Sequence, residues 1–263
     1  MVFSILALPG AQRLAAQGAD AVLRGFEPSG DWMLVVAGKE LPKARIYDST
    51  RAQALLLMSA ELPSPVLIDR ATRSVATLDL MKVSERSDGS IDLLADAVLA
   101  PSGTIEIQNR TDAGFTVDGK QVVLKPRPWM LGLQRGTVLL EGDAGYRWRA
   151  KRYEPDSGSI ASLRSERREV RILTFFGSWC PHCKEHLPLL LKTEQRLADA
   201  KVRFDYYGLP SSIKSDAEAA KWNVDGVPTA IVLVGGKEIG RIPNGSWASP
   251  EVALALLLHP PKG

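Results

Sequence analysis

The sequence contains few of the residues that most often carry redox or metal chemistry. Among its 263 residues, only two are cysteines and three are histidines. Cys180 and Cys183 belong to one short motif, so no cysteine is left for a structural disulfide elsewhere. The single disulfide that the chain can form internally closes a very short loop, which removes little chain entropy. We therefore expect this pair to serve chemistry rather than stability.

Charge of one sign and long apolar runs are lacking as well. The formal net charge is +3, and no face is basic enough to follow the phosphates of a nucleic acid, so we expect no nucleic-acid partner. No stretch approaches the roughly 18 uncharged apolar residues of a membrane span. Hydrophobic residues make up 45% of the sequence and charged residues 24%, an ordinary globular balance with ample material for a core. The length favours two domains.

The N-terminal segment, residues 1–30, allows two interpretations. An apolar run at 2–8 and the small-x-small sequence at 19–21 fit a secretory signal segment. No lysine or arginine precedes the run, however, and Arg13 interrupts the sequence that follows it. The alternative is a short N-terminal strand or helix, and the sequence leaves both open.

Residues 31–153 are predicted to form a β-rich domain. Short runs of β-branched and apolar residues are separated by Asp-Gly turns at 88–89 and 118–119, a pattern typical of hairpins. These runs lie at 66–68, 75–83, 103–108, 115–117 and 122–125. Residues 49–61 fit either a helix or a strand. The polar stretch at 154–165 contains proline, glycine and serine and is predicted to be a linker.

From residue 166 to 263 strand and helix signals alternate. The predicted order is strand, helix, strand, helix, strand, strand, helix, at 170–176, 181–200, 202–208, 215–223, 229–234, 238–242 and from 249 onward. Ser215 is the predicted cap of the second helix, three residues ahead of Glu218 in a capping box. This order predicts an α/β domain.

The motif Cys180-Pro181-His182-Cys183 joins the end of the first of these strands to the start of the following helix. Unpaired backbone N–H groups at a helix N-terminus favour negative charge, and a thiolate is the nucleophile in thiol chemistry. We therefore predict Cys180, at the exposed turn, to be the attacking sulfur. Cys183, one turn into the helix and more covered, is predicted to resolve the resulting mixed disulfide.

Pro181 and His182 are predicted to tune this nucleophile. When protonated, His182 places a cation beside Cys180, which stabilises the reduced form and makes the disulfide a stronger oxidant. Pro181 limits the freedom of the turn. The alternative for the cysteine pair is a zinc site with His182 and His186, but its ligands would all crowd into 180–186 without a second arm, so we predict no metal.

The strand, the Trp-Cys-x-x-Cys motif and the helix, followed by Gly226-Val227-Pro228-Thr229, resemble the thioredoxin superfamily over residues 166–261. The resemblance implies a thioredoxin-like fold, with a mixed central sheet flanked by helices, preceded here by the β-rich domain. It implies that Pro228 is a cis-proline which, with Val227, offers backbone atoms to the extended chain of a substrate. It also implies that Trp179 packs beside the active site and shields it.

Within the superfamily the sequence combines two patterns. The run 179–188 is similar to extracytoplasmic thioredoxins of the TlpA and ResA kind. The Pro-His pair and Val227 are similar to DsbA-like oxidases, but the interval before Pro228 has no room for the helical insertion of those enzymes.

Two positions depart from the family patterns. Thr174 stands where thioredoxins place a buried aspartate. His186 stands where TlpA-like proteins often place a glutamate, with Glu185 adjacent but expected on another face of the helix. His186 is therefore either a proton carrier for Cys183, one helical turn away, or a surface histidine.

The resemblance implies a thiol–disulfide oxidoreductase that acts on protein thiols and disulfides through a mixed disulfide on Cys180, without a cofactor. The direction stays open, because the Pro-His pair favours an oxidant or isomerase and the TlpA-like frame a reductant. The alternative is a non-enzymatic interaction protein that uses the fold as a platform for the N-terminal domain. A peroxidase is disfavoured, because peroxiredoxins normally lack this cysteine pair and use a Thr-x-x-Cys arrangement, which is missing here.

The similarity of residues 179–188 to thioredoxins of the TlpA and ResA kind implies a periplasmic or other extracytoplasmic location, with the cytoplasm as the alternative. The β-rich domain either positions substrate, mediates dimerisation or receives electrons from a membrane redox partner. The sequence does not separate these three roles and indicates no oligomeric state.

Overall fold

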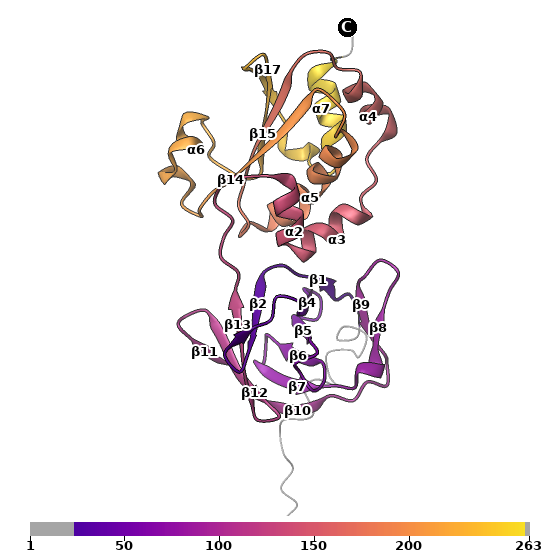
Figure 1. Cartoon of the computed structure of the whole chain (residues 1–263), viewed down its shortest axis with the longest axis vertical. Coiled ribbons are helices and arrows are strands. Elements are labelled where there is room, and N and C mark those ends of the chain that lie inside the picture. Colours follow the sequence, from indigo (N-terminus) through magenta and orange to yellow (C-terminus); the bar gives the residue numbers. More distant parts are fainter. Residues whose placement is uncertain (1–23, 261–263) are drawn as a thin grey trace, which may run out of the picture. The chain divides into compact units, whose positions relative to one another are not determined.

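The computed structural model describes residues 24–260. Of the segment interpreted as a signal or N-terminal element, residues 1–23 lie outside this described range. The chain divides into two units, one ending at Arg127 and the other beginning at Pro128 (Figure 1). Between residues 24 and 260, no helix is both long and apolar enough to cross a bilayer.

The N-terminal unit consists of antiparallel sheets, in line with its hairpin signals. A six-stranded sheet has the order β1-β4-β5-β6-β7-β10, a five-stranded sheet has the order β11-β12-β13-β2-β3, and β8 pairs with β9. The elements are β1 (Glu27–Pro28), β2 (Trp32–Val36), β3 (Lys39–Glu40), β4 (Arg45–Ser49), β5 (Ala54–Met58), β6 (Val66–Asp69), β7 (Ser74–Thr77), the 3-10 turn η1 (Leu80–Lys82), β8 (Val83–Glu85), β9 (Ile91–Leu93), β10 (Ala100–Thr104), β11 (Glu106–Gln108), β12 (Asp112–Val117) and β13 (Lys120–Pro126).

Two apolar clusters hold these sheets together. The first joins side chains of β5, β6 and β7 in the six-stranded sheet to side chains of β2, β12 and β13 in the five-stranded sheet. The second joins the other face of the six-stranded sheet to β9. Leu55 and Leu57 of β5 belong to the first cluster, and Leu56 and Met58 to the second. Because both faces of β5 are covered, its sequence lacks the alternation of a half-exposed strand, which is why residues 49–61 fitted both helix and strand.

The expected tight hairpin at Asp118-Gly119 is present. β12 and β13 pair with Val117 opposite Lys120, and the two turn residues have φ values of 47° and 75°. A two-residue turn with positive φ at both positions follows the twist of the strands. The strand expected at 75–83, in contrast, is interrupted by η1.

The C-terminal unit is built on a five-stranded mixed sheet with the order β14-β16-β15-β17-β18. β15 and β16 are parallel, and all other neighbours are antiparallel. The strands are β14 (Gly132–Gln134), β15 (Val170–Phe176), β16 (Val202–Gly208), β17 (Thr229–Val234) and β18 (Lys237–Arg241). The strands predicted at 170–176, 202–208 and 229–234 are confirmed residue by residue.

Helices cover both faces of this sheet (Figure 1). They are α2 (Gly136–Gly142), α3 (Ala144–Arg152), α4 (Ser157–Arg164), α5 (Pro181–Arg196), α6 (Ala217–Lys221) and α7 (Pro250–Leu258), with 3-10 turns η2 (Ile213–Ser215) and η3 (Asn244–Ser246). Ile172 and Phe176 of β15 pack in the cluster that contains α5 and α7. Leu173 and Phe175 point to the opposite cluster, which contains Ala219 of α6. The strand that leads to the cysteine motif is therefore the buried centre of the unit.

The boundary between the units lies earlier in the chain than the sequence suggested. The predicted β-rich domain, 31–153, ends at Arg127 in the structure, and β14, α2 and α3 belong to the following unit. The strand pattern was misleading here because α3 is short and basic, and its apolar residues do not form a strong stripe: Tyr146, Trp148 and Ala150 are buried at alternate positions.

The stretch predicted as a linker, 154–165, contains α4 instead. Its proline, serine and glycine residues form a helix start, because the carboxylate of Asp156 accepts a hydrogen bond from the N–H of Ser159 at 2.7 Å. Ile160 and Leu163 are then buried against the rest of the unit. An aspartate also caps α6: the N-cap residue is Asp216, and the prediction of Ser215 is wrong.

Glu251, at the start of α7, ties three other helices of the unit together. Its side chain accepts hydrogen bonds from the hydroxyl of Tyr153 after α3 (2.6 Å) and the N–H of Asp156 before α4 (3.1 Å). It also lies 3.5 Å from the hydroxyl of Thr193 in α5, which has a closer acceptor in the carbonyl oxygen of Leu189 at 3.0 Å. Glu251 is only 1% exposed. Burial, reinforced by this carboxylate, raises the pKa of Tyr153, so the phenol stays a donor. A buried carboxylate is tolerated here because its partners satisfy it.

We expect Glu251→Ala to destabilise the C-terminal unit by about 3 kcal/mol, because the half-buried hydroxyl of Tyr153 and the N–H of Asp156 lose their acceptor. Urea unfolding followed by far-UV circular dichroism measures the change. The matched control is Glu154→Ala, which removes an exposed carboxylate paired with Arg196 and is expected to cost less than about 0.5 kcal/mol. Equal losses in the two variants would contradict the role given to Glu251.

Candidate active site

The cysteine motif lies where β15 ends and α5 begins, as predicted. Gly177, Ser178 and Trp179 connect the two elements, and Cys180 is the N-cap of α5 with an extended backbone (φ −85°, ψ 123°). Pro181 follows in the first turn, where the missing N–H of proline leaves no helical hydrogen bond unmade. The first sulfur is thereby placed at the end of the helix where backbone N–H groups lack partners.

Both cysteines are free and covered, which corrects the expected exposure of Cys180. Cys180 is 6% exposed and Cys183 is fully buried. Cys180 is more covered than the sequence suggested because Trp179 and Val227 pack against the same apolar cluster. Cys180 is nevertheless the more accessible of the two sulfurs, as expected.

Cys183 is a buried thiol beneath the end of β15. Its Sγ accepts a hydrogen bond from the N–H of Gly177 at 3.3 Å. Burial raises the pKa of Cys183 far above that of a free thiol; the Gly177 N–H opposes this, and the neighbouring Cys180 sulfur adds to it. Cys183 therefore keeps its proton at neutral pH.

The loop before β17 reaches the first sulfur. The thiol of Cys180 donates a hydrogen bond to the carbonyl oxygen of Val227 at 3.6 Å. The peptide bond between Val227 and Pro228 is cis, the geometry that the resemblance implied. Residues far apart in the sequence thus meet at the N-terminus of α5.

Trp179 forms one wall of the site. Its indole N–H donates to the carbonyl oxygen of Leu209 at 2.8 Å. The ring lies so close to Gly177 that a Cβ there would come within 2.6 Å of it, so only glycine fits at 177. The ring of Trp129 lies 6.3 Å from that of Trp179, centroid to centroid, tilted by 53°.

Residues 129–130 were missed by the sequence interpretation, which placed them in the β-rich domain. Besides the contact of Trp129, the N–H of Met130 donates to the hydroxyl of Ser178 at 3.0 Å. No local sequence signal marks this segment, because its contacts depend on the pairing of β14 with β16.

Thr174 occupies the position under the motif where an aspartate was expected from the resemblance. Strand alternation places it on the same face as Ile172 and Phe176, whose cluster contains both cysteines. Thr174 is fully buried, and its hydroxyl has no hydrogen-bond partner. The site therefore has a neutral hydroxyl at this position.

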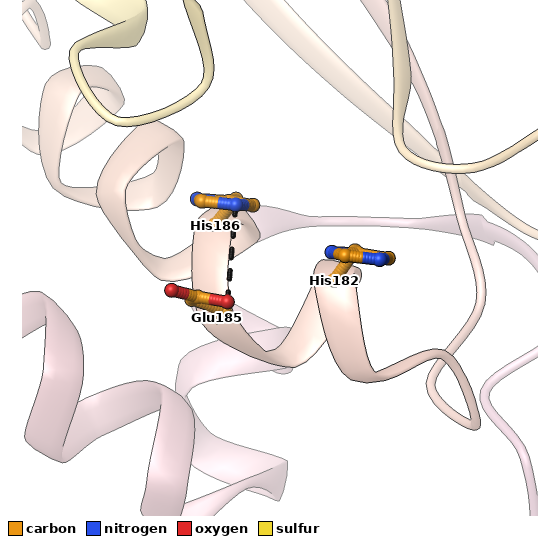
Figure 2. A group of neighbouring side chains, drawn as sticks. All are labelled: His182, Glu185 and His186. Atoms are coloured by element: carbon orange, nitrogen blue, oxygen red, sulfur yellow. Dashed lines mark ion pairs between the residues drawn. The ribbon is translucent and has the colours of Figure 1, made fainter. Parts of the chain in front are cut away.

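The outer side of the first turns of α5 brings together His182, Glu185 and His186 (Figure 2). The two imidazole rings are parallel, with an interplanar angle of 1° and centroids 6.5 Å apart. Nε2 of His186 lies 3.9 Å from a carboxylate oxygen of Glu185. Glu185 is 64% exposed and His186 only 23%, and the long side chain of Glu185 bridges the angle between these adjacent helical positions. The proton-carrier role of His186 stays a prediction.

These three side chains are the ones able to share a metal ion within the part of the chain that the structure describes. They differ from the zinc set that the sequence analysis considered, because neither cysteine belongs to the group. The sequence signal for this group is the spacing i, i+3, i+4, with a histidine at i, a glutamate at i+3 and a histidine at i+4 of one helix.

We expect Cys183 in the Cys180→Ser variant to resist iodoacetamide at neutral pH, because burial keeps its thiol protonated. Labelling should begin only in strongly alkaline solution. In guanidinium chloride the same thiol should react near the ordinary thiol pKa of about 8.5, which provides the control. Mass spectrometry measures the alkylated fraction, and rapid labelling of the folded variant at neutral pH would contradict the assignment.

Comparisons with known proteins agree with this arrangement. A family model described as thioredoxin matches residues 161–250. Thioredoxin-2 of Saccharomyces cerevisiae is 33% identical over 84 residues, which cover 32% of this chain and 76% of that protein.

Two solved thioredoxin structures align with part of the chain. Thioredoxin f2 of Chlamydomonas reinhardtii aligns with a TM-score of 0.30 and 21% identity, over 39% of this chain and 91% of that one. A thioredoxin of Nicotiana alata aligns with a TM-score of 0.27 and 20% identity, over 41% and 96%. With the family match over 161–250 and the cysteine motif between β15 and α5, the chain belongs to the thioredoxin superfamily through its C-terminal unit.

Proposed function

We propose that the C-terminal unit exchanges disulfides with protein substrates, with Cys180 as the attacking sulfur and Cys183 as the resolving sulfur. The observation that carries this proposal is the unequal burial of two free thiols at one helix N-terminus. Membership of the superfamily supports thiol–disulfide oxidoreductase chemistry in general.

In the reducing direction, the thiolate of Cys180 attacks one sulfur of a substrate disulfide. The new bond joins Cys180 to the substrate, and the other substrate sulfur leaves as a thiolate and takes up a proton. Cys183 then loses its proton and attacks the Cys180 sulfur, which releases the second substrate thiol. The chain passes from two thiols to one disulfide, and the substrate disulfide gains two electrons and two protons. The oxidising direction reverses each step, and the potentials of the chain and its partner decide between them.

The environment of each group supports its role. Cys183 keeps its proton until the first step is complete, because burial raises its pKa. The carbonyl of Val227 accepts the Cys180 thiol hydrogen bond and so lies beside the first sulfur, where we propose that an extended substrate backbone binds. Trp179, whose indole N–H donates to Leu209, packs against the cluster that contains both cysteines, and we propose that it shields them from one side.

We expect Cys183→Ser to accumulate mixed disulfides with protein substrates, because the sulfur that resolves them is gone. Non-reducing electrophoresis followed by mass spectrometry should locate the bond at Cys180. Cys180→Ser is the matched control and should trap no substrate.

The catalytic assays are insulin reduction with a thiol reductant and reoxidation of a reduced, unfolded protein. Cys180→Ser should lower either activity to the rate without added protein, because its hydroxyl is not a nucleophile at neutral pH. A wild-type chain that is inactive in both assays, and whose Cys183→Ser variant traps nothing, would favour the platform alternative.

We also propose that the protein works outside the cytoplasm, on the basis of the similarity of residues 179–188 to thioredoxins of the TlpA and ResA kind. Fractionation of cells that produce the chain should place it in the extracytoplasmic fraction. Recovery with a cytoplasmic marker enzyme would reject this proposal and leave the chemistry of the cysteines unaffected.

A further inference from the structure

We propose that His182, Glu185 and His186 form a binding site for a divalent transition-metal ion of the zinc type on the outer side of α5. The three groups occupy the first, fourth and fifth positions of one helical stretch, which place side chains on neighbouring parts of a helix surface. One ligand atom from each lies within 4.8 Å of the others. The site involves neither cysteine and does not depend on the proposed function.

The donor set selects the class of ion. Two imidazole nitrogens and one carboxylate oxygen, with a remaining position for water, are ligands that zinc accepts at about 2.0–2.2 Å. Magnesium and calcium prefer sites made of oxygen. Bonds of that length would bring the ligand atoms to roughly 3.4 Å from one another, so the present spacing closes by small side-chain rotations. His182 and Glu185 are exposed and can make these rotations.

The least mobile ligand is already free of competing hydrogen bonds. The His186 side chain is 23% exposed, and its Nδ1 is buried without a hydrogen-bond partner. Its Nε2 lies 3.9 Å from the Glu185 carboxylate, which is beyond hydrogen-bond distance. Figure 2 shows the carboxylate of Glu185 on the side of the His186 ring where Nε2 lies, with the His182 ring parallel to it. An ion can therefore bind Nε2 without breaking an existing bond.

One effect opposes binding. The N-terminus of a helix carries partial positive charge, which disfavours a cation near the first turn. Glu185 supplies a formal negative charge at that place, and two neutral imidazoles add donors without adding charge. The carboxylate is therefore required by the proposal as well as both histidines.

The chain offers a matched comparison in His259. Its Nε2 lies 3.7 Å from a carboxylate oxygen of Glu166, so the approach of imidazole to carboxylate is similar. Among the described residues, however, no third ligand group joins that pair. Because Arg168 already pairs with the Glu166 carboxylate, His259 offers a metal ion a single imidazole donor. His259 therefore represents the weak affinity of an isolated histidine, which the proposed site should exceed.

The experiment uses the full chain without a polyhistidine tag and with Cys180→Ser and Cys183→Ser, so that no thiol can bind the ion. Zn²⁺ is the calorimetric probe and Co²⁺ the spectroscopic probe. We expect one Zn²⁺ per chain, and a visible Co²⁺ spectrum without the charge-transfer band of thiolate ligands. Because the cysteines are absent, failure of this test leaves the proposed exchange chemistry untouched, and failure of the exchange assays leaves this site untouched.

In that background, Glu185→Gln and His186→Asn should each weaken Zn²⁺ binding by roughly tenfold or more, at least the effect of losing an outer-shell partner. His259→Asn should leave the affinity unchanged. Glu185 is 64% exposed, so Glu185→Gln tests the site with little risk to folding, and circular dichroism checks the histidine variants. Absence of Zn²⁺ uptake by the parent, or an unchanged affinity in Glu185→Gln or in His186→Asn, would overturn the proposal.

Discussion

The unequal burial of two sulfurs at the start of α5 is the constraint on which the proposed exchange chemistry depends. Two equally exposed thiols would be equally reactive, so their exposure would not separate an attacking thiol from a resolving one. Here Cys183 lies beneath the end of β15, with its sulfur on the N–H of Gly177, while Cys180 lies at the helix end and contacts Val227. The difference comes from where the strand stops and the helix starts. A change in that junction would therefore alter the burial of both sulfurs, and with it the proposed roles of Cys180 and Cys183.

The rest of the C-terminal unit keeps this junction in place. β15 is the central strand, with β16 and β17 as neighbours, and its two faces are covered by separate apolar clusters. α5 is packed from its cysteine end to Leu197 into the cluster that α7 and the shorter helices complete. Trp179 closes the loop from outside and can do so only because residue 177 has no side chain. The position of the sulfurs is thus set by packing over the whole unit rather than by the motif alone.

Sequence reasoning identified the strands of this unit and the two sulfurs because each left a local signal. β15, β16 and β17 are apolar runs bounded by turn residues, and the Cys-Pro-His-Cys motif is typical of thiol–disulfide exchange. It failed where the outcome depended on distant partners. The covering of Cys180 depends on Val227, 47 positions away, and the contacts of residues 129–130 depend on the pairing of β14 with β16. A local sequence pattern carries no information about contacts between residues that are far apart in the chain. The helix at Ser157–Arg164 was also missed, for a local reason, because proline, serine and glycine occur at a helix start capped by Asp156 as well as in linkers.

The buried carboxylate of Glu251 has a consequence for the order in which the polypeptide matures on the ribosome. The N-terminal unit ends at Arg127, so all of its strands have been synthesised before most of the second unit exists. The hydroxyl of Tyr153 and the N–H of Asp156, in contrast, lack this acceptor until α7, the final described helix, has been synthesised. Domains generally fold as units during synthesis, N-terminal first. The half that carries the sulfurs is then the last to reach its final packing, and its thiols stay open to oxidants in the meantime.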